Sequence, residues 1–246
     1  MTGLNYSTYI TQIMQMAVID ASDANFAAIL PSMIDYAEQR IYRDLDLLEV
    51  STSLTGESYK LTAGDRKLSF SKDLSSGGYF NIIEQINLII PAGSTDPDAA
   101  MRLPLMATTK EFLDAVYGSA VLSNLGQPKY FAPFNDSLFI VGPAPLQDYY
   151  VEVVGTYRPA PLSETNTTTF ISKYMPDLMI MASMVYISAY QRNFGRQADD
   201  PQMAQSYEGQ YQGLLKGALV EEARKKFEAA AWTSQSPAVV ASPTRG

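Results

Sequence analysis

The sequence predicts an α+β fold: an antiparallel helical bundle with a β-rich insert and an extended C-terminal tail. Three observations lead to this expectation. Apolar residues recur at helical spacing near both ends of the chain, short β-like runs fill its middle, and its last residues have no periodicity. The expected boundaries are 1–48 for N-terminal helices, 49–171 for the insert, 172–230 for a C-terminal helical hairpin and 231–246 for the tail.

The N-terminal segment predicts two helices. Tyr6, Ile10 and Ile13 recur at helical spacing within a first helix over 5–19. Asp23 is the expected N-cap of a short turn that runs through residue 30. Pro31 then suits the first position of a second helix, where a missing N–H breaks no helical hydrogen bond.

The middle of the chain changes to short runs rich in β-branched and aromatic residues. The strand candidates are 50–54, 58–61, 67–70, 82–90, 138–141 and 149–157. One helix is expected to interrupt them from Thr108 to Tyr117, because Thr108 and Glu111 have the spacing of a capping box.

Two further helices are expected near the C-terminus. Residues 177–192 are apolar almost all round, which is typical of a central helix covered on several sides. The last helix is expected to begin at Asp199 or Asp200 with Pro201 and to reach Ala230. Thirty helical residues span about 45 Å, more than the width of a small domain, so the far end is expected to project.

Three glycines in this last helix, Gly209, Gly213 and Gly217, are spaced by four residues. Each weakens a helix by roughly 0.8–1 kcal/mol relative to alanine. On one face of the helix they would allow close packing by a neighbouring helix. They are equally consistent with a helix that is weak in its middle, and the sequence leaves both interpretations open.

Composition excludes several classes of function. With no Cys and no His, the chain has no disulfides, no thiolate nucleophile and no Cys/His zinc site. The start of the chain does not have the pattern of a signal peptide, and the longest apolar run, 178–190, is shorter than the ~20 residues that span a bilayer. A net charge of −8 argues against sequence-independent binding to a phosphate backbone.

Carboxylates are the remaining groups for acid–base chemistry. Asp44, Asp46 and Glu49 lie close together in sequence, as do Asp199 and Asp200. Each group lies at an expected helix end, and nothing in the pattern predicts the burial or close pairing that would perturb a catalytic pKa. We therefore expect no enzyme, no cofactor and no metal site.

A succession of motifs between residues 126 and 192 resembles a known family. Gly126 opens Gly-Gln-Pro-Lys-Tyr-Phe-Ala, and two strand-like runs follow at 138–141 and 150–154. Tyr157 then begins Tyr-Arg-Pro-Ala-Pro-Leu, and Tyr174 begins Tyr-Met-Pro-Asp-Leu at the start of the apolar helix. This order, with matching helices at both ends, resembles the head-to-tail adaptor (connector) proteins of short-tailed bacteriophages over roughly residues 4–228.

The resemblance implies a structural virion protein rather than an enzyme. Proteins of this family form a ring of twelve copies between the portal and the tail nozzle. The implied partners are thus the portal protein, the tail nozzle protein and further copies of the chain, with DNA passing through the channel without specific binding. The implied location is the neck of the virion, with assembly in the host cytoplasm.

The resemblance also suggests roles for particular residues. The end of the last helix and the tail would dock on the portal, whereas cations there would otherwise only complement the helix dipole. The docking residues would be Arg224, Lys225, Lys226, Phe227, Trp232, Pro237, Pro243 and Arg245. Residues that face the tail or a neighbouring subunit would be Lys129, Tyr130 and Phe131.

Two alternatives remain open. The chain could be a nozzle or tail-completion protein, although it is short and has no repeated β modules. It could also be a cell-wall hydrolase acting through two carboxylates, which would make a residue such as Glu38 or Glu84 indispensable.

Overall fold

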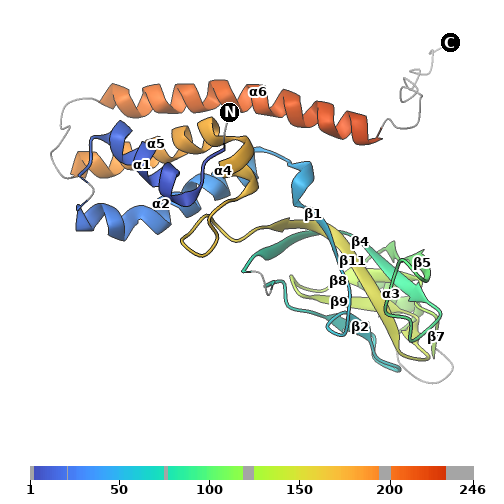
Figure 1. Ribbon diagram of the computed structural model, residues 1–246. Helices are drawn as coiled ribbons and strands as arrows, with labels where there is room; N and C mark the ends of the chain where they lie inside the picture. The colour runs from blue at the N-terminus through green and yellow to red at the C-terminus, as the bar shows by residue number, and fades with distance from the viewer. Residues whose placement is uncertain (1–2, 21, 75–76, 119–124, 194–200, 231–246) are drawn as a thin grey trace, which may run out of the picture. The chain divides into compact units, whose positions relative to one another are not determined.

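The computed structural model describes residues 3–20, 22–74, 77–118, 125–193 and 201–230 (Figure 1). The chain divides into two compact units. The helical unit combines Met1–Glu49 with Pro161–Gly246, and the β unit is the continuous segment Val50–Ala160.

The helical unit is built around one apolar helix. Helix α5 (Pro176–Asn193) packs against α1 (Tyr6–Ala17), α2 (Ala24–Asp44), α4 (Phe170–Tyr174) and α6 (Pro201–Ala230). Leu178, Met179, Ala182, Met184 and Ile187 of α5 are all buried. The expectation of a central helix covered on several sides is thus confirmed.

Helix α2 begins earlier than the sequence predicts. The Asp23 side chain does cap a helix, accepting hydrogen bonds from the N–H groups of Asn25 and Phe26. That helix then continues through Pro31 instead of stopping near residue 30, so the predicted break is wrong. Burial of Phe26, Leu30 and Ile34 along α2 stabilises the helix across a residue that cannot donate a backbone hydrogen bond.

A buried carboxylate attaches α2 to the segment that precedes α4. Glu38 is 3% exposed, and it accepts hydrogen bonds from the Leu162 N–H at 3.1 Å and from Thr169 Oγ1 at 2.7 Å. Burial raises the pKa of Glu38 to about 7, although both hydrogen bonds favour the charged form. Thr169 is also the N-cap of α4, so one side chain fixes the position of a whole turn.

The β unit contains eleven strands among the described residues, most of them short. They are β1 (Ser51–Leu54), β2 (Lys60–Leu61), β3 (Lys67–Ser69), β4 (Tyr79–Ile90), β5 (Met101–Pro104), β6 (Met106–Ala107), β7 (Leu125–Gly126), β8 (Tyr130–Pro133), β9 (Leu138–Gly142), β10 (Ala144–Pro145) and β11 (Tyr149–Arg158). A 3-10 turn (Leu48–Val50) precedes them, and α3 (Lys110–Val116) lies between β6 and β7.

Most strands pair antiparallel, in curled sheets. One sheet has the order β1-β11-β4-β5, with β2 also paired to β11, and a second has the order β3-β9-β8-β6. The strands β10 and β7 form a two-stranded sheet. The pairing of β11 with β4 is irregular beside Gly155, where an added Cβ would lie 2.0 Å from the Ile82 carbonyl oxygen. Only glycine permits the two backbones to approach so closely there.

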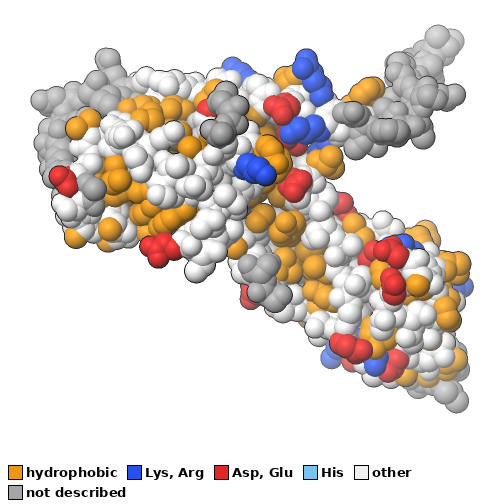
Figure 2. Space-filling view, viewed as in Figure 1, with side chains coloured by type: hydrophobic (Ala, Val, Ile, Leu, Met, Phe, Trp, Pro, Cys, Tyr) orange, Lys and Arg blue, Asp and Glu red, His pale blue; other side chains and the backbone are white. Residues whose placement is uncertain are grey.

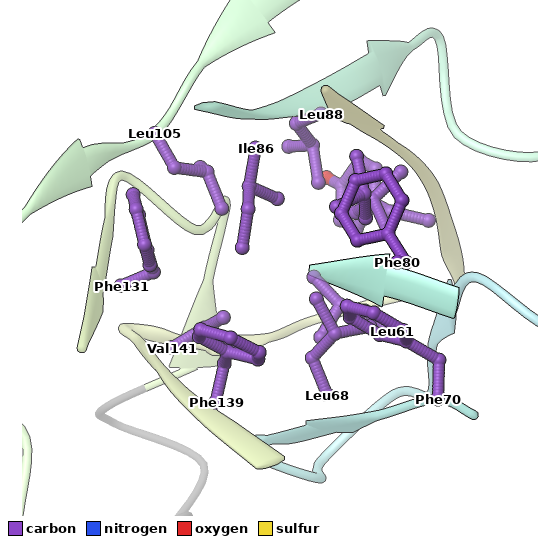
Figure 3. Close-up of a cluster of buried hydrophobic side chains, with 13 residues drawn as sticks. Leu61, Leu68, Phe70, Phe80, Ile86, Leu88, Leu105, Phe131, Phe139 and Val141 are labelled. Carbon is purple, nitrogen blue, oxygen red and sulfur yellow. The ribbon is translucent and has the colours of Figure 1, made fainter. Parts of the chain in front are cut away.

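The two larger sheets enclose a hydrophobic core (Figure 3). Its buried side chains come from β2, β3, β4, β8, β9 and β11, from a residue next to β3, and from the residue between β5 and β6. They are Leu61, Leu68, Phe70, Phe80, Ile86, Leu88, Leu105, Phe131, Phe139, Val141, Tyr149, Val151 and Val153. This core belongs to the β unit alone, because every one of these residues lies within Val50–Ala160.

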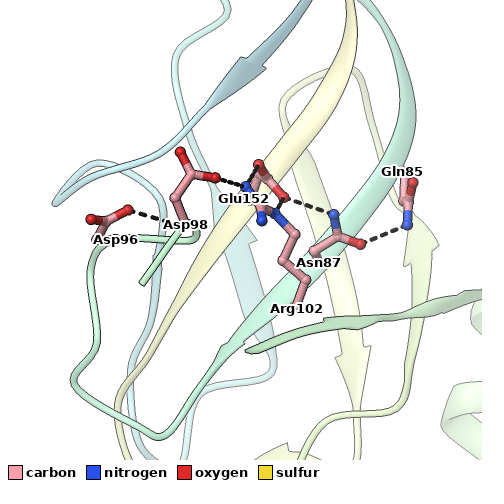
Figure 4. A network of polar contacts seen from close by, with 6 residues as sticks. All are labelled: Gln85, Asn87, Asp96, Asp98, Arg102 and Glu152. Atoms are coloured by element: carbon pink, nitrogen blue, oxygen red, sulfur yellow. Dashed lines mark hydrogen bonds and ion pairs between the residues drawn. The ribbon is translucent and has the colours of Figure 1, made fainter. Parts of the chain in front are cut away.

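A polar network centred on the buried Glu152 joins three neighbouring strands (Figure 4). Glu152 of β11 accepts hydrogen bonds from Asn87 of β4 and from Arg102 of β5, each at 2.8 Å. Arg102 also donates to Asp98 at 2.7 Å, which attaches the loop before β5 to the sheet. The buried charge is therefore paired and hydrogen-bonded, as burial of a carboxylate requires.

The predicted fold class, a helical bundle with a β-rich insert, is wrong. The described residues contain six α-helices and three sheets of five, four and two strands, and the β unit has a core of its own. The prediction gave most weight to the long helices, because the strands are short. The strands β4 and β11 are an exception, because they pair from Val151 to Arg158, with register shifts at Val154/Gly155 and Thr156/Tyr157.

The interrupting helix was predicted one residue too early. Thr109, not Thr108, is the N-cap of α3, and its side chain accepts the hydrogen bond of the Phe112 N–H at 3.3 Å. The backbone N–H of Thr108 instead donates to the Phe131 carbonyl, as an extension of the β6–β8 pair. The capping-box interpretation of Thr108 and Glu111 is therefore wrong.

Candidate interaction surface on helix α6

The inner face of α6 is attached to α2 by polar and aromatic contacts. Tyr211 is buried, and its hydroxyl donates to Asp44 at 2.7 Å. The Arg40 guanidinium lies 4.0 Å from the centre of the Tyr211 ring and donates to Glu208 at 2.5 Å. The hydrogen bond from Arg40 lowers the pKa of Glu208. These contacts determine which side of α6 is turned towards the core.

Two of the three cations near the C-terminal end of α6 have partners within the helical unit. Lys225 forms ion pairs with the buried Glu222 at 2.7 Å and with Glu221 at 3.2 Å, and the hydrogen bond with Glu222 raises the pKa of Lys225. Lys226 forms an ion pair with Asp46. Lys225 and Lys226 therefore serve first to fix α6 within its own unit.

The opposite side of α6 forms an exposed stripe. With 3.6 residues per turn, spacings of four, four, three, four and three residues keep side chains on one face of a helix. This surface, the outer stripe, consists of Gly209, Gly213, Gly217, Val220, Arg224 and Phe227, and all six are exposed. The structure thus places the predicted glycines on the same face as Arg224 and Phe227, and turns Lys225 and Lys226 away from it.

The glycines of the outer stripe pack against no other described segment of the chain. A Cβ added at Gly209, Gly213 or Gly217 would meet no atom within 4 Å. Beside Gly213 and Gly217 lies a hollow of about 510 Å³, formed by α6 and by the junction of α4 with α5. Its other walls include Tyr174, Leu178 and Leu214. Within the described part of the chain, these glycines are therefore open to a further packing partner.

The three β-unit residues suggested for contacts differ in accessibility. Lys129 is exposed, whereas Tyr130 is half-buried between the rings of Phe112 and Tyr117, with ring centres 5.7 and 6.3 Å away. Phe131 is 8% exposed and belongs to the hydrophobic core. Lys129 and Tyr130 are therefore available to a partner, and Phe131 supports the surface from beneath.

Four of the suggested docking residues, Trp232, Pro237, Pro243 and Arg245, lie outside the described residues. So do Asp199 and Asp200, the expected start of α6. The described part of the helix begins at Pro201.

Neither of the named candidate carboxylates has the surroundings of a catalytic group. Glu38 is buried and both of its oxygens accept structural hydrogen bonds, so a polymeric substrate has no access to it. Glu84 is exposed on β4. Within the described ranges no group of three or more acidic residues could hold a metal ion, and no helix there is long and apolar enough to cross a membrane.

Comparison with known families decides the identity of the chain. The sequence model of the SU10 adaptor protein family matches residues 4–240. The chain belongs to the SU10 adaptor protein family. The match spans both units and continues past α6, so it includes every suggested contact residue except Pro243 and Arg245. No curated protein matches the chain.

Family membership confirms the resemblance to phage head-to-tail adaptors. As an SU10 adaptor protein, the chain is a structural protein of a bacteriophage virion and a component of its neck. An adaptor of this kind contacts other head and tail components, which agrees with an exposed stripe that no other described segment of the chain covers.

Val18, which belongs to no sequence motif, has an unusual backbone conformation. Val18 follows α1 with φ 52° and ψ 48°, in the left-handed region, and its side chain is 81% exposed. A β-branched residue is rare in that conformation, which glycine or asparagine normally occupies. The only sequence signal was the absence of a glycine where α1 had to end.

Proposed function

We propose that this adaptor forms a ring, of twelve copies as in the related short-tailed phages, that joins the portal to the tail nozzle and extends the DNA channel. The observation that carries the proposal is the family match over residues 4–240. The net charge of −8 supports a channel that DNA passes through without being held. Assembly would take place in the host cytoplasm.

The end of α6 that leads into the tail is the part that we assign to the portal. Arg224 and Phe227 lie on the outer stripe, and Phe227 is 56% exposed. An arginine beside an exposed aromatic ring is a common pair at the centre of protein interfaces. The tail beyond residue 230 would extend this contact with Trp232, Pro237, Pro243 and Arg245.

The β unit would face the tail nozzle. Tyr130, which follows Lys129, contacts the exposed Phe112, and Lys110 lies over the ring of the exposed Phe134, which gives this unit accessible aromatic side chains with cations beside them. The proposal thus assigns the two ends of the adaptor to different partners, and each end has its own set of residues to test.

Native mass spectrometry of the chain, alone and mixed with the portal of its own phage, tests the assembly. We expect a discrete complex that carries one portal ring and about a dozen copies of this chain. A chain that persists as a monomer beside an unmodified portal would overturn the proposal and favour a nozzle or tail-completion protein.

Charge reversal at the outer stripe tests the portal end. Arg224→Glu combined with Phe227→Ala is expected to weaken portal binding by about 10- to 100-fold, as loss of an interface hot spot does. Arg43→Glu makes the same charge reversal on the exposed end of α2 and is expected to have little effect. Lys225 and Lys226 are unsuitable for this test because their loss would unpair Glu222 and Asp46.

Two further variants separate the partners. Deletion of residues 233–246 is expected to weaken portal binding without unfolding either unit. Lys129→Glu is expected to reduce binding of the nozzle and to leave the portal complex intact. If the deletion and the Arg224/Phe227 variant both bind the portal normally, the C-terminal end of α6 is not the docking end.

A further inference from the structure

Helix α1 exposes a face without charge. None of its residues from Tyr6 to Ala17 is Lys, Arg, Asp or Glu, although charged residues make up 18% of the chain. Its exposed side chains are Ser7, Thr8, Thr11, Gln12, Gln15 and Met16. In Figure 2 the surface over α1 is white and orange, with red and blue side chains at its margins. Depletion of charge distinguishes the centre of a protein interface from ordinary solvated surface.

The C-terminal end of this face bears two exposed apolar side chains. Met16 is 41% exposed and Val18 is 81% exposed. Val18 is also in the left-handed backbone conformation, which a β-branched side chain disfavours. Because Val18 neither fills the core nor suits its backbone, the stability of the chain itself gives no reason for a valine there. Contact with another molecule would explain the exposed valine.

The hollow beside the outer stripe has the complementary character. Gly213 and Gly217 leave its floor open, and Tyr174, Leu178 and Leu214 supply apolar walls. Its volume of about 510 Å³ is within the range of sites that enclose a small ligand, which is enough for two side chains such as Met16 and Val18. The exposed Val220 continues the apolar surface along α6.

Charge around the hollow is mixed. Lys173 lines the hollow and the exposed Lys216 lies beside the glycines on α6, while Asp177 and Glu221 also line the hollow. The end of α1 is the negative pole of that helix and is followed by the exposed Asp20. Of the charged groups at the hollow, Lys173 and Lys216 are the ones that would attract this negative helix end.

We propose that the C-terminal end of α1 in one copy of the chain inserts into the glycine-floored hollow of α6 in the next copy. This inference rests on the proposed function, since it names the surfaces through which the ring closes. The occupant is a second copy because one chain carries both halves of the contact, and the two halves share no residue. Two different complementary surfaces make a heterologous contact, the kind that closes into rings of many subunits.

The end of α1 would also receive part of its partner. A shallow hollow of about 590 Å³ lies beside Val18 and is lined by Thr11, Met14, Gln15, Val18, Ile19 and Asp20. It suits the exposed Val220 of the neighbouring outer stripe, so that each surface contributes a projection and a recess. Such interdigitation is typical of closely packed subunit interfaces.

Disulfide cross-linking tests the contact directly, because the chain contains no cysteine. A disulfide forms only where two Cα atoms come within roughly 4.4–6.8 Å of each other. Val18→Cys and Gly217→Cys are combined in one full-length chain, assembled with the portal and oxidised. Gly217 accepts a side chain without a clash, so the variant is expected to fold.

The expected result is a ladder of covalent multimers in the double variant. An assembled mixture of the two single variants should give dimers and nothing larger, and each single variant alone should give no cross-link. The control pair Ser32→Cys and Gly217→Cys replaces Val18 by an exposed position of α2 and should give little or no cross-linked product.

Other outcomes would overturn the inference in distinguishable ways. A portal complex of about a dozen copies without a ladder would leave the proposed function intact and exclude this interface. Dimers from Val18→Cys alone would show that two α1 ends meet each other, which is a different contact. Failure to form any portal complex would overturn the proposed function, and the inference would fall with it.

Discussion

At the scale of single residues, the phase of a helix decides which side chains are free to act. Arg224, Lys225 and Lys226 are adjacent in sequence, but successive residues of a helix point about 100° apart. Only Arg224 lies on the outer stripe, whereas Lys225 and Lys226 pair with Glu222 and Asp46. The cluster can be identified from the sequence. Which of its cations are paired within the helical unit and which is exposed depends on contacts with distant residues.

Val18 is the residue at which stability and function should diverge. A left-handed conformation disfavours an L-residue by roughly 1–2 kcal/mol, and asparagine tolerates it better. Val18→Asn is thus expected to raise the free energy of unfolding of the helical unit by about 1 kcal/mol, because the exposed valine contributes little burial. Urea denaturation followed by circular dichroism measures the change.

Val18→Ala is the matched control for this prediction. It removes the exposed apolar side chain but keeps a Cβ in the left-handed conformation, so it should stabilise the unit less than Val18→Asn does. Equal unfolding midpoints for the two variants would contradict the argument from strain. If Val18 also contacts a neighbouring copy, Val18→Asn should stabilise the isolated chain and weaken its assembly.

At the scale of elements, long runs were predictable and short ones were not. The predicted strands at 82–90, 138–141 and 149–157 correspond to β4, β9 and β11, and the helices α1, α5 and α6 lie where periodicity put them. The two-residue strands β6, β7 and β10 exist only through their partners, so no local pattern announces them. The same limit applies to α2, where tertiary burial overrides the break that Pro31 suggests.

The attachment of α2 to α4 predicts a pH dependence. Folding raises the pKa of Glu38 from the ordinary 4.5 to about 7, so the folded chain binds this proton more tightly than the unfolded chain. The protonated carboxyl therefore contributes to the free energy of unfolding. This contribution is fully present below pH 4.5 and is lost as the pH rises through 7. Between about pH 5 and pH 8, it should decrease on the order of 2–3 kcal/mol.

Glu38→Gln isolates this effect. Other carboxylates, such as Glu208, have lowered pKa values and act in the opposite direction, so the informative quantity is the difference between wild type and variant. Relative to Glu38→Gln, the wild type should lose stability steadily from about pH 5 to pH 8 in urea titrations. A difference that does not change with pH would show that Glu38 keeps an ordinary pKa in the folded protein.

At the scale of the whole molecule, the chain passes out of one unit and back into it. The β unit is a continuous segment, and its first and last long strands are neighbours, with Ser51 of β1 paired to Thr156 of β11. The two ends of the segment therefore lie side by side. The helical unit is made from the two flanking parts of the chain. The sequence changes from helical to strand-like patterns near residue 49, but these patterns do not show that the middle segment has a core of its own.

This arrangement predicts that Val50–Ala160 folds when it is produced alone. Its core is complete within the segment, and the buried Glu152 finds its partners Asn87 and Arg102 there as well. Producing the segment alone would therefore leave Glu152 paired, because both of these partners remain present. The excised segment should show dispersed amide resonances and a cooperative thermal transition, as compact domains of about 100 residues do.

The same experiment discriminates between a self-sufficient unit and an insert that depends on the helices. Phe80→Ala within the excised segment removes a fully buried ring and should lower its unfolding free energy by about 3–5 kcal/mol, enough to abolish the transition. Ile82→Ala, at a half-exposed position of the same strand, should have a much smaller effect. If the wild-type segment itself unfolds without cooperativity, the β unit requires the helical unit, and contacts assigned to Lys129 and Tyr130 must be tested in the full chain alone.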